Sequence, residues 1–175
     1  YYSTNSSIYS FKIFCLMTNK FTILGSGSSL GVPRIDGDFG KCNPNNQKNH
    51  RTRCCAHLKF NDISILIDTS PDLRSQLLRN KIKEVDCVLY THAHADQTHG
   101  INDLRAFYIK YRKRLNVYAD RLTKKHLMSS FGYCFKNKPG YPAILKMNLL
   151  KKKLYFKSKK KNLTIEPIIA QHGYI

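Results

Sequence analysis

The sequence predicts an α/β fold with a buried sheet. Three observations lead to this prediction: short apolar and β-branched runs typical of strands, amphipathic stretches typical of helices, and clusters of Gly, Pro and Asn between them. Strands and helices mix along the chain, as in α/β domains. With 175 residues, 42% of them hydrophobic, the length suits one domain or part of a larger one.

The first predicted elements are a strand and a hairpin. Phe21 to Leu24 is a short apolar strand, and a polar loop rich in Gly, Asn and Pro spans Arg34 to Arg53. Alternating apolar residues up to Phe60, a turn at Asn61-Asp62 and alternation from Ile63 to Ile67 then predict two strands joined by a tight turn.

A capped helix is predicted after the hairpin. Ser70 is its expected N-cap, Pro71 its first residue, and it ends near Asn80. Its apolar stripe is expected on Leu73, Leu77 and Leu78. The later elements are a buried strand over Val85 to Tyr90, a helix around Leu104 to Tyr108, a strand over Leu115 to Tyr118, a helix over Leu122 to Phe131 and a strand over Leu163 to Ala170.

The chain is strongly basic, with 30 Lys and Arg against 11 Asp and Glu and a net charge of +19. Such a surface favours anionic partners. The 21 Lys against 9 Arg, together with 13 Asn, also fit an AT-rich coding sequence whatever the function. The densest basic run, Lys151 to Lys161, is interpreted as a solvated hairpin or linker.

The sequence also leads to expectations about cellular localisation and domain boundaries. No run reaches the roughly 18–20 apolar residues of a membrane helix, so no membrane association is expected. The six cysteines contain no C-x-x-C pair, which favours reduced thiols in a cytoplasm. Residues 1–16 precede the first methionine, Met17, and are interpreted as a non-native or disordered extension. Residues 17–175 form the expected domain, incomplete at its C-terminal end because the chain stops as a new strand pattern begins.

A dense set of metal-ligating residues follows the strand over Val85 to Tyr90. His92, His94 and Asp96 alternate along the chain, and residues i and i+2 of an extended segment point the same way. Two imidazoles and a nearby carboxylate suit Zn²⁺, Mn²⁺ or Fe²⁺ in an open site. The alternative is a loop that is rich in histidine without binding a metal.

These residues resemble the H-x-H-x-D-H signature of metallo-β-lactamase fold hydrolases. The glycine-rich segment over Gly25 to Pro33, the turn over Ile67 to Asp72 and the segment Gly100 to Arg105 resemble the branch that contains phosphoribosyl cyclic phosphate phosphodiesterases of phosphonate metabolism. Ribonuclease Z enzymes are more distant relatives. The resemblance implies an αββα sandwich, truncated here after the first half and the start of the second.

The resemblance also implies roles for two residues outside the loop. His172 matches the third histidine of the first metal position. Asp68 matches a carboxylate that supports the metal-binding loop and orients its ligands without binding the metal itself. The alternatives are an ordinary strand-end histidine and a helix-capping aspartate.

The sequence departs from the family pattern in two ways. Gln97 stands where a second-metal histidine is expected, and His99 is an alternative, weak ligand of that second site. With Cys42 alone before Cys54-Cys55, no cysteine-bound structural zinc is expected. The bridging aspartate and final histidine of the family would follow Gly173, so the fragment alone is expected to be inactive.

The resemblance implies a metal-dependent hydrolase, in the first instance a phosphodiesterase acting on a cyclic or other phosphodiester through a metal-bound hydroxide. One or two zinc ions are expected, with Asp96 as a metal-binding and catalytic residue. The expected partner is a small phosphorylated substrate; nucleic acid and a homo-oligomer stay open. The alternatives are an RNA-processing or RNA-binding protein of the same fold, a thioester or lactam hydrolase, and a non-catalytic, degraded relative.

Overall fold

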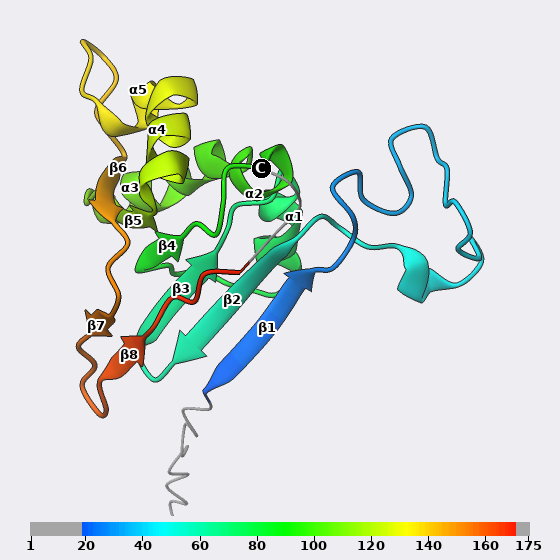
Figure 1. Ribbon diagram of the computed structural model, residues 1–175, viewed down its shortest axis with the longest axis horizontal. Helices are drawn as coiled ribbons and strands as arrows, with labels where there is room; N and C mark the ends of the chain where they lie inside the picture. Colours follow the sequence, from blue (N-terminus) through cyan, green and yellow to red (C-terminus); the bar gives the residue numbers. More distant parts are fainter. Residues whose placement is uncertain (1–18, 171–175) are drawn as a thin grey trace, which may run out of the picture.

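The computed structural model describes residues 19–170. Its centre is a six-stranded sheet in the order β1-β2-β3-β4-β5-β6, and β7 pairs with β8 in a separate two-stranded sheet (Figure 1). The mixed α/β fold with a central sheet confirms the predicted fold class. Two sequence predictions, the extension over residues 1–16 and the ligand His172, lie outside the described residues.

The strands and helices have the following bounds. The strands are β1 Lys20–Gly25, β2 Cys55–Phe60, β3 Ile63–Ile67, β4 Cys87–Leu89, β5 Leu115–Ala119, β6 Leu145–Leu149, β7 Leu154–Phe156 and β8 Leu163–Ile165. The α-helices are α1 Leu73–Arg79, α2 Ala95–Thr98, α3 Arg105–Tyr111, α4 Arg121–Ser130 and α5 Gly132–Phe135, and the 3-10 helices are η1 Gln47–Asn49 and η2 Ile101–Leu104.

The direction of the strands brings two loops together at one edge of the sheet. β1, β2 and β3 pair antiparallel, whereas β3, β4, β5 and β6 pair parallel. Ile67 at the end of β3 is in register with Leu89 at the end of β4. The loops that follow these two strands therefore leave the sheet side by side, as the carboxyl ends of parallel strands do.

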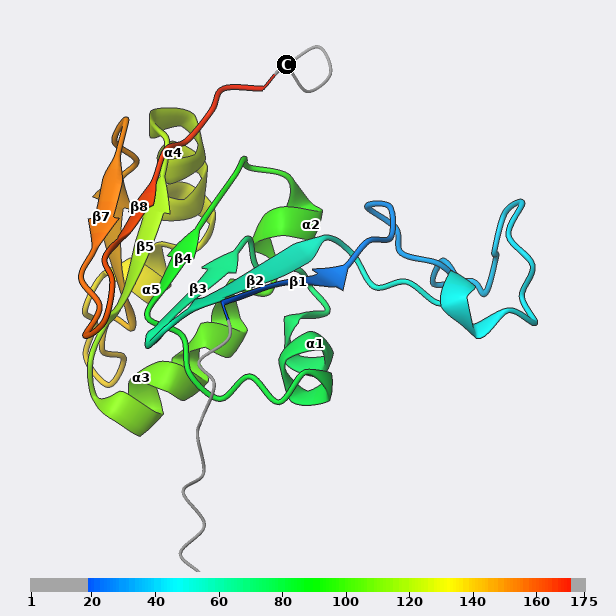
Figure 2. The same cartoon turned by 90° about the horizontal axis from the view of Figure 1, so that it is seen from below.

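The two faces of the sheet have different covers. Alternation along β3 directs Leu66 to one face and Ile65 to the other. The first face packs against helices, and Figure 2 shows α1 and α3 on that side. The second face contacts the β7–β8 hairpin through Leu154. On β1, Phe21 is 59% exposed and Ile23 68% exposed, so part of the sheet presents apolar side chains to solvent.

Three local predictions were wrong, two of them in the bounds of an element and one in the burial of a residue. The last strand ends at Ile165 rather than Ala170. The first helix begins at Leu73 with Asp72 as N-cap, although the Ser70 hydroxyl still accepts a hydrogen bond from the Asp72 amide at 3.0 Å. Leu78 is 64% exposed and does not belong to the buried stripe. The Lys151–Lys161 run, interpreted as a solvated hairpin or linker, contains β7, which pairs antiparallel with β8 just beyond the run.

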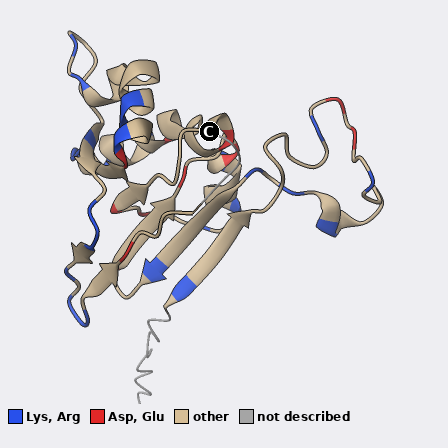
Figure 3. Cartoon of the chain, viewed as in Figure 1, with Lys and Arg blue, Asp and Glu red and all other residues tan. Residues whose placement is uncertain are grey.

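An arm formed by residues 26–53 connects the end of β1 to the start of β2 and extends away from the sheet (Figures 1 and 2). Backbone bonds between Val32 and Arg51 and between Gly27 and Thr52 close its base. Lys and Arg are spread over the arm, α4, the β7–β8 hairpin and the ends of β1 and β2 (Figure 3). Within residues 19–170, no helix has both the length and the apolar content that crossing a membrane requires.

Candidate metal centre

The His92 and His94 side chains meet in the loop between β4 and α2. Nε2 of His92 lies 2.9 Å from Nδ1 of His94, and the two rings are 4.5 Å apart between centroids at an interplanar angle of 75°. His94 has extended backbone angles, φ −74° and ψ 154°, before the chain turns into α2. The alternation of side chains in an extended segment thus brings two imidazole nitrogens to one point.

Asp68 holds the start of this loop. Its Oδ1 accepts a hydrogen bond from the Thr91 amide at 2.8 Å, and its Oδ2 accepts one from the Thr91 hydroxyl at 2.7 Å. The same hydroxyl oxygen lies 2.9 Å from Nδ1 of His92. A continuous chain of contacts therefore runs from the end of β3 to the first histidine of the loop.

The position of Asp68 is buried and conformationally unusual. The residue is 6% exposed and has a φ of 64°, a left-handed conformation that Asp adopts more readily than most residues. Burial raises the pKa of its carboxyl to about 6, the nearby Asp96 carboxylate adds to the rise, and the hydrogen bonds from Thr91 oppose it. Asp68 thus combines a strained backbone conformation with a buried carboxyl group at the position that anchors the loop.

This raised pKa predicts a pH-dependent stability. The Asp68 carboxyl binds its proton more tightly in the folded chain, with a pKa of about 6, than in the unfolded chain, near 3.8. Protonation of Asp68 therefore stabilises the folded chain fully at a pH below the pKa of the unfolded chain, and this stabilisation is lost as the pH rises through about 6. Between about pH 7 and about pH 4.5, the native chain should gain about 2 kcal/mol of unfolding free energy relative to Asp68→Asn.

Urea titrations of both proteins with a chelator present measure this difference. The comparison cancels other titrating groups, such as His57, whose pKa is lowered by burial and by Lys59 and Lys20. Parallel pH profiles for the two proteins would contradict the prediction.

Asp96 and Gln97 form a polar pair in the first turn of α2. Gln97 is 7% exposed, and its Nε2 donates a hydrogen bond to Oδ2 of Asp96 at 2.9 Å. Among the described residues, Oε1 of Gln97 has no hydrogen-bond partner although it is buried. This contact holds Oδ2 of Asp96 in place. Because the two carboxylate oxygens are rigidly joined, it also fixes the direction in which Oδ1 points.

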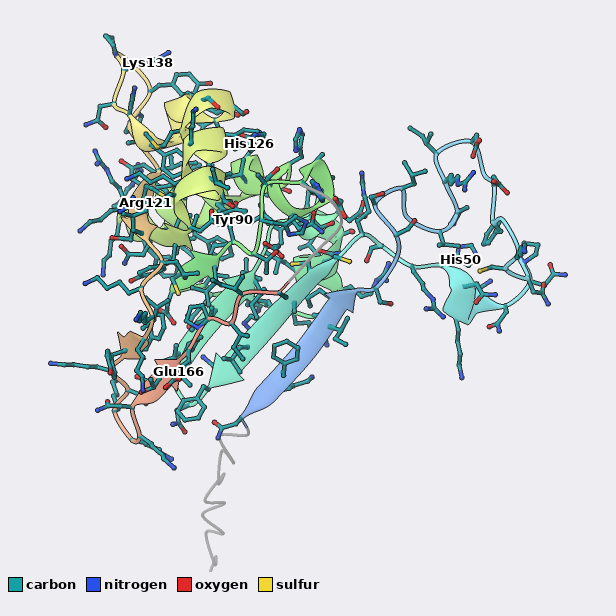
Figure 4. All side chains as sticks on the ribbon, in the orientation of Figure 1. His50, Tyr90, Arg121, His126, Lys138 and Glu166 are labelled. Carbon is teal, nitrogen blue, oxygen red and sulfur yellow. The ribbon has the colours of Figure 1, made fainter. Side chains whose placement is uncertain are left out.

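The end of α2 is fixed against the turn that follows β3. The Thr69 amide donates to the Gln97 carbonyl at 2.7 Å, and the Gly100 amide donates to the Thr69 carbonyl at 2.9 Å. The Thr69 and Tyr90 hydroxyls lie 2.7 Å apart in the core below (Figure 4 labels Tyr90). Burial raises the pKa of Tyr90, so its phenol stays neutral and hydrogen-bonded.

The donor set is compatible with one metal ion. Within residues 19–170, no group of three or more His, Cys, Asp or Glu is placed to hold an ion. His92 and His94 nevertheless supply two nitrogens at one point, and neutral imidazole is a preferred ligand of Zn²⁺. The third predicted ligand, His172, lies outside the described residues, so His92 and His94 fit two ligands of a three-ligand centre.

His99, the alternative second-site ligand, contacts other groups. It is exposed at the end of α2, its Nδ1 lies 3.1 Å from the Thr98 hydroxyl, and its ring meets Phe131 edge-on at 5.4 Å between centroids. The structure does not bring it into a group of three potential ligands within the described part of the chain.

Two arginines of the arm pair with carboxylates. Arg53 makes a bidentate pair with Asp72, with contacts of 2.7 and 2.9 Å. Arg34 pairs with Asp38 at 3.0 Å on the exposed surface. Figure 4 shows His50 out on the arm.

Sequence reasoning missed Thr91 and the contact made by Gln97. Thr91 stands directly before His92, where a hydroxyl at the end of a buried strand is the available signal. Its link to Asp68 depends on the parallel pairing of β3 with β4 and is not visible from local spacing.

Comparison with known proteins gives three main findings. A family model described as "Beta-lactamase superfamily domain" matches residues 64–175. A protein of Porphyromonas gingivalis (strain ATCC BAA-308 / W83) named octanoyltransferase is 35% identical over 153 residues, which cover 86% of this chain and 30% of that protein. A crystal structure of a new diphosphatase from the PhnP family is 32% identical with a TM-score of 0.67, over 81% of this chain and 54% of that one.

A more distant structure agrees in fold. The Zn²⁺-bound PqqB of Methylobacterium extorquens is 18% identical with a TM-score of 0.55, and the match covers 78% of this chain and 51% of that one. The chain thus spans about half the length of these two solved structures and 30% of the curated relative.

Proposed function

The chain belongs to the metallo-β-lactamase fold family, and from that membership we propose that it forms the metal-binding half of a phosphoester hydrolase. The proposed substrate is a phosphodiester, cyclic or linear, or a phosphoanhydride. The family resemblance predicted from the sequence is confirmed. The reaction and the substrate are proposals for the whole protein.

The contact between His92 and His94 carries the proposal. Two imidazole nitrogens 2.9 Å apart, at the carboxyl edge of a parallel sheet, form the start of a metal centre. In the proposed site, His92, His94 and His172 would hold one divalent ion. Such an ion supplies a nucleophile at neutral pH, because it lowers the pKa of a coordinated water from about 15.7 to about 7, and it neutralises charge on phosphoryl oxygens.

The residues around the histidines have separate roles in this proposal. Asp96 would accept a hydrogen bond from the attacking water and orient it toward phosphorus. Gln97 fixes the rotation of that carboxylate through the 2.9 Å contact to Oδ2, which leaves Oδ1 for the water. With a carboxamide in place of an imidazole at this position, we propose a site with one ion rather than two.

Two observations support phosphate chemistry over other reactions of the fold. The solved structure with 32% identity is named a diphosphatase. The net charge of +19 attracts anionic substrates, even where coding bias accounts for part of it. The name octanoyltransferase belongs to a protein of which this chain matches 30%, so acyl chemistry is a weaker candidate.

Hydrolysis assays on the full-length protein that contains this chain test the proposal. The probes are a nucleoside cyclic phosphate, a nucleotide diphosphate, a short RNA and, as a counter-probe, an octanoyl ester. We expect zinc-dependent hydrolysis of a phosphate probe that a chelator abolishes and that the double variant His92→Ala/His94→Ala lacks. Phosphate hydrolysis that persists in the chelated protein and in the double variant would contradict the proposal.

The RNA probe also separates an RNA-binding function from catalysis. Binding without cleavage, with an affinity that falls steeply as salt increases, would favour the binding alternative and overturn the hydrolase proposal. Cleavage of the octanoyl ester alone would favour acyl chemistry.

A further inference from the structure

We propose that Thr91 is a positioning residue that selects the tautomer of His92 by connecting it to Asp68. The inference rests on the proposed function, since it assigns His92 as a metal ligand. The roles of Thr91 and of its proton follow from the hydrogen bonds around one hydroxyl group.

The first step is the proton count at the Thr91 hydroxyl. A threonine hydroxyl has one proton to donate and lone pairs that accept. Oδ2 of Asp68 lies 2.7 Å away and, as a carboxylate oxygen, accepts that proton. Oδ1 of Asp68 is already occupied by the Thr91 amide. The hydroxyl proton is therefore committed to the carboxylate.

The second step assigns the proton of His92. Nδ1 of His92 lies 2.9 Å from the Thr91 oxygen, which has no second proton to give. The ring nitrogen must therefore be the donor, and neutral His92 carries its hydrogen on Nδ1. Its Nε2 then presents a lone pair, and this is the atom that faces Nδ1 of His94.

The third step concerns the metal. A neutral imidazole binds an ion through its unprotonated nitrogen, and a hydrogen bond at the other nitrogen fixes both tautomer and ring orientation. His92 is thus arranged for binding through Nε2 before an ion arrives. In the 2.9 Å contact between the rings the donor is then Nδ1 of His94, so His94 alone has to change tautomer to offer that nitrogen.

The left-handed backbone of Asp68 fits this role. A φ of 64° in a non-glycine residue costs free energy and persists only where the surroundings enforce it. Here the Asp68 amide donates to the Leu89 carbonyl at 2.9 Å, which ties the residue to β4 just before the metal loop. The carboxylate is thereby held in place to accept both hydrogen bonds from Thr91.

Nitrogen NMR of the metal-free chain tests the tautomer directly. The chain is labelled with ¹⁵N-histidine, and the signals of its seven histidines are assigned by single His substitutions. We expect His92 in the Nδ1–H form in the native chain and in Thr91→Ser, which keeps the hydroxyl. Thr91→Val has nearly the same shape but no hydroxyl, so the preference for Nδ1–H should be lost.

Zinc affinity, measured by competition with a chromophoric chelator, gives a second readout. Thr91→Val should bind zinc about 10–100-fold more weakly than the native chain, the usual cost of removing a partner that orients a metal ligand. Thr91→Ser should stay near the native affinity. Thr164→Val makes the same chemical change at an exposed position of β8 and should also leave the affinity unchanged.

Asp68→Asn provides a sharper variant that does not depend on the folding of Thr91→Val. Asn also tolerates the left-handed backbone, and its carboxamide oxygen can still accept from the Thr91 amide. Its Nδ2–H would donate to the Thr91 hydroxyl, which would then donate its own proton to Nδ1 of His92. We therefore expect the tautomer of His92 to invert to Nε2–H and the zinc affinity to fall.

The two readouts distinguish the failure of this inference from the failure of the proposed function. A native chain that binds no zinc contradicts the proposed function, while the tautomer of metal-free His92 is still measured. His92 in the Nε2–H form in the native chain overturns the inference. Retention of Nδ1–H and of native zinc affinity in both Thr91→Val and Asp68→Asn also overturns it.

Discussion

Replacing His92 or His94 by Ala is expected to lower the zinc affinity of the chain by more than about 100-fold, beyond the usual cost of losing a residue that only supports a ligand. Each substitution removes one of the two nitrogens that lie 2.9 Å apart. The variant would bind the ion with one fewer protein ligand. A water molecule could take the empty position, but the free ion is already hydrated, so a bond to water adds no affinity.

His50→Ala is the matched control for these variants. His50 is exposed on the arm, where its ring contacts Phe39 at 5.0 Å between centroids (Figure 4). Its removal should leave zinc affinity unchanged, which separates loss of a ligand from nonspecific binding to surface histidines. Native affinity in both His92→Ala and His94→Ala would show that the metal, if bound, is held elsewhere.

Gly100→Ala is expected to destabilise the fold by about 3 kcal/mol or more, or to prevent folding. A Cβ at this position would lie 2.0 Å from the Ser70 carbonyl oxygen and 3.0 Å from Cβ of Leu73. Because the nearest atom belongs to the backbone, the substitution must move either the end of α2 or the turn after β3. That movement would also break the hydrogen bond from the Gly100 amide to the Thr69 carbonyl.

Gly132→Ala is the control for this prediction. Gly132 is the first residue of α5, and within the described residues no atom outside its own helix and chain neighbours lies within 4 Å of the added Cβ. The change should be neutral or slightly stabilising, since Ala favours a helix over Gly by up to about 1 kcal/mol. Urea denaturation measures both variants. Equal stability of Gly100→Ala and Gly132→Ala would contradict the tight contact at Gly100.

The elements that local sequence patterns predict well are the hairpin of β2 and β3 and the histidine loop. Alternation from Ile63 to Ile67 has period two and a short turn before it, so it defines both strands and their faces. The spacing of His92 and His94 similarly places two side chains on one side of an extended segment.

Features that depend on contacts distant in sequence were either missed or given wrong bounds. β6, Leu145–Leu149, has mixed polar and apolar residues and becomes a strand because it pairs in parallel with β5. β8 ends at Ile165, two residues before Pro167, which has no amide hydrogen for a further ladder bond. α1 begins at Leu73, and the carboxylate of its N-cap Asp72 pairs with Arg53, which is 19 residues away in the sequence, a contact that local patterns do not reveal.

The candidate site also combines residues that local sequence predicts with contacts that only the folded sheet creates. His92 and His94 are two residues apart in the sequence and could be proposed from their residue types and spacing, whereas His172 was proposed only from the family resemblance. The Asp68–Thr91 contact arises only when β3 and β4 align with Ile67 opposite Leu89. The position of Gln97 was visible, but its hydrogen bond to Asp96 depends on the first turn of α2.

The metal content of the purified chain tests the central claim most directly. The chain is purified, exposed to excess zinc, passed through a desalting column and measured by elemental analysis. One zinc ion per chain, absent from the His92→Ala/His94→Ala variant, is the result expected from two converging imidazoles and a carboxamide at residue 97. A folded chain that retains no zinc after this treatment would contradict the metal centre and the hydrolase proposed from it.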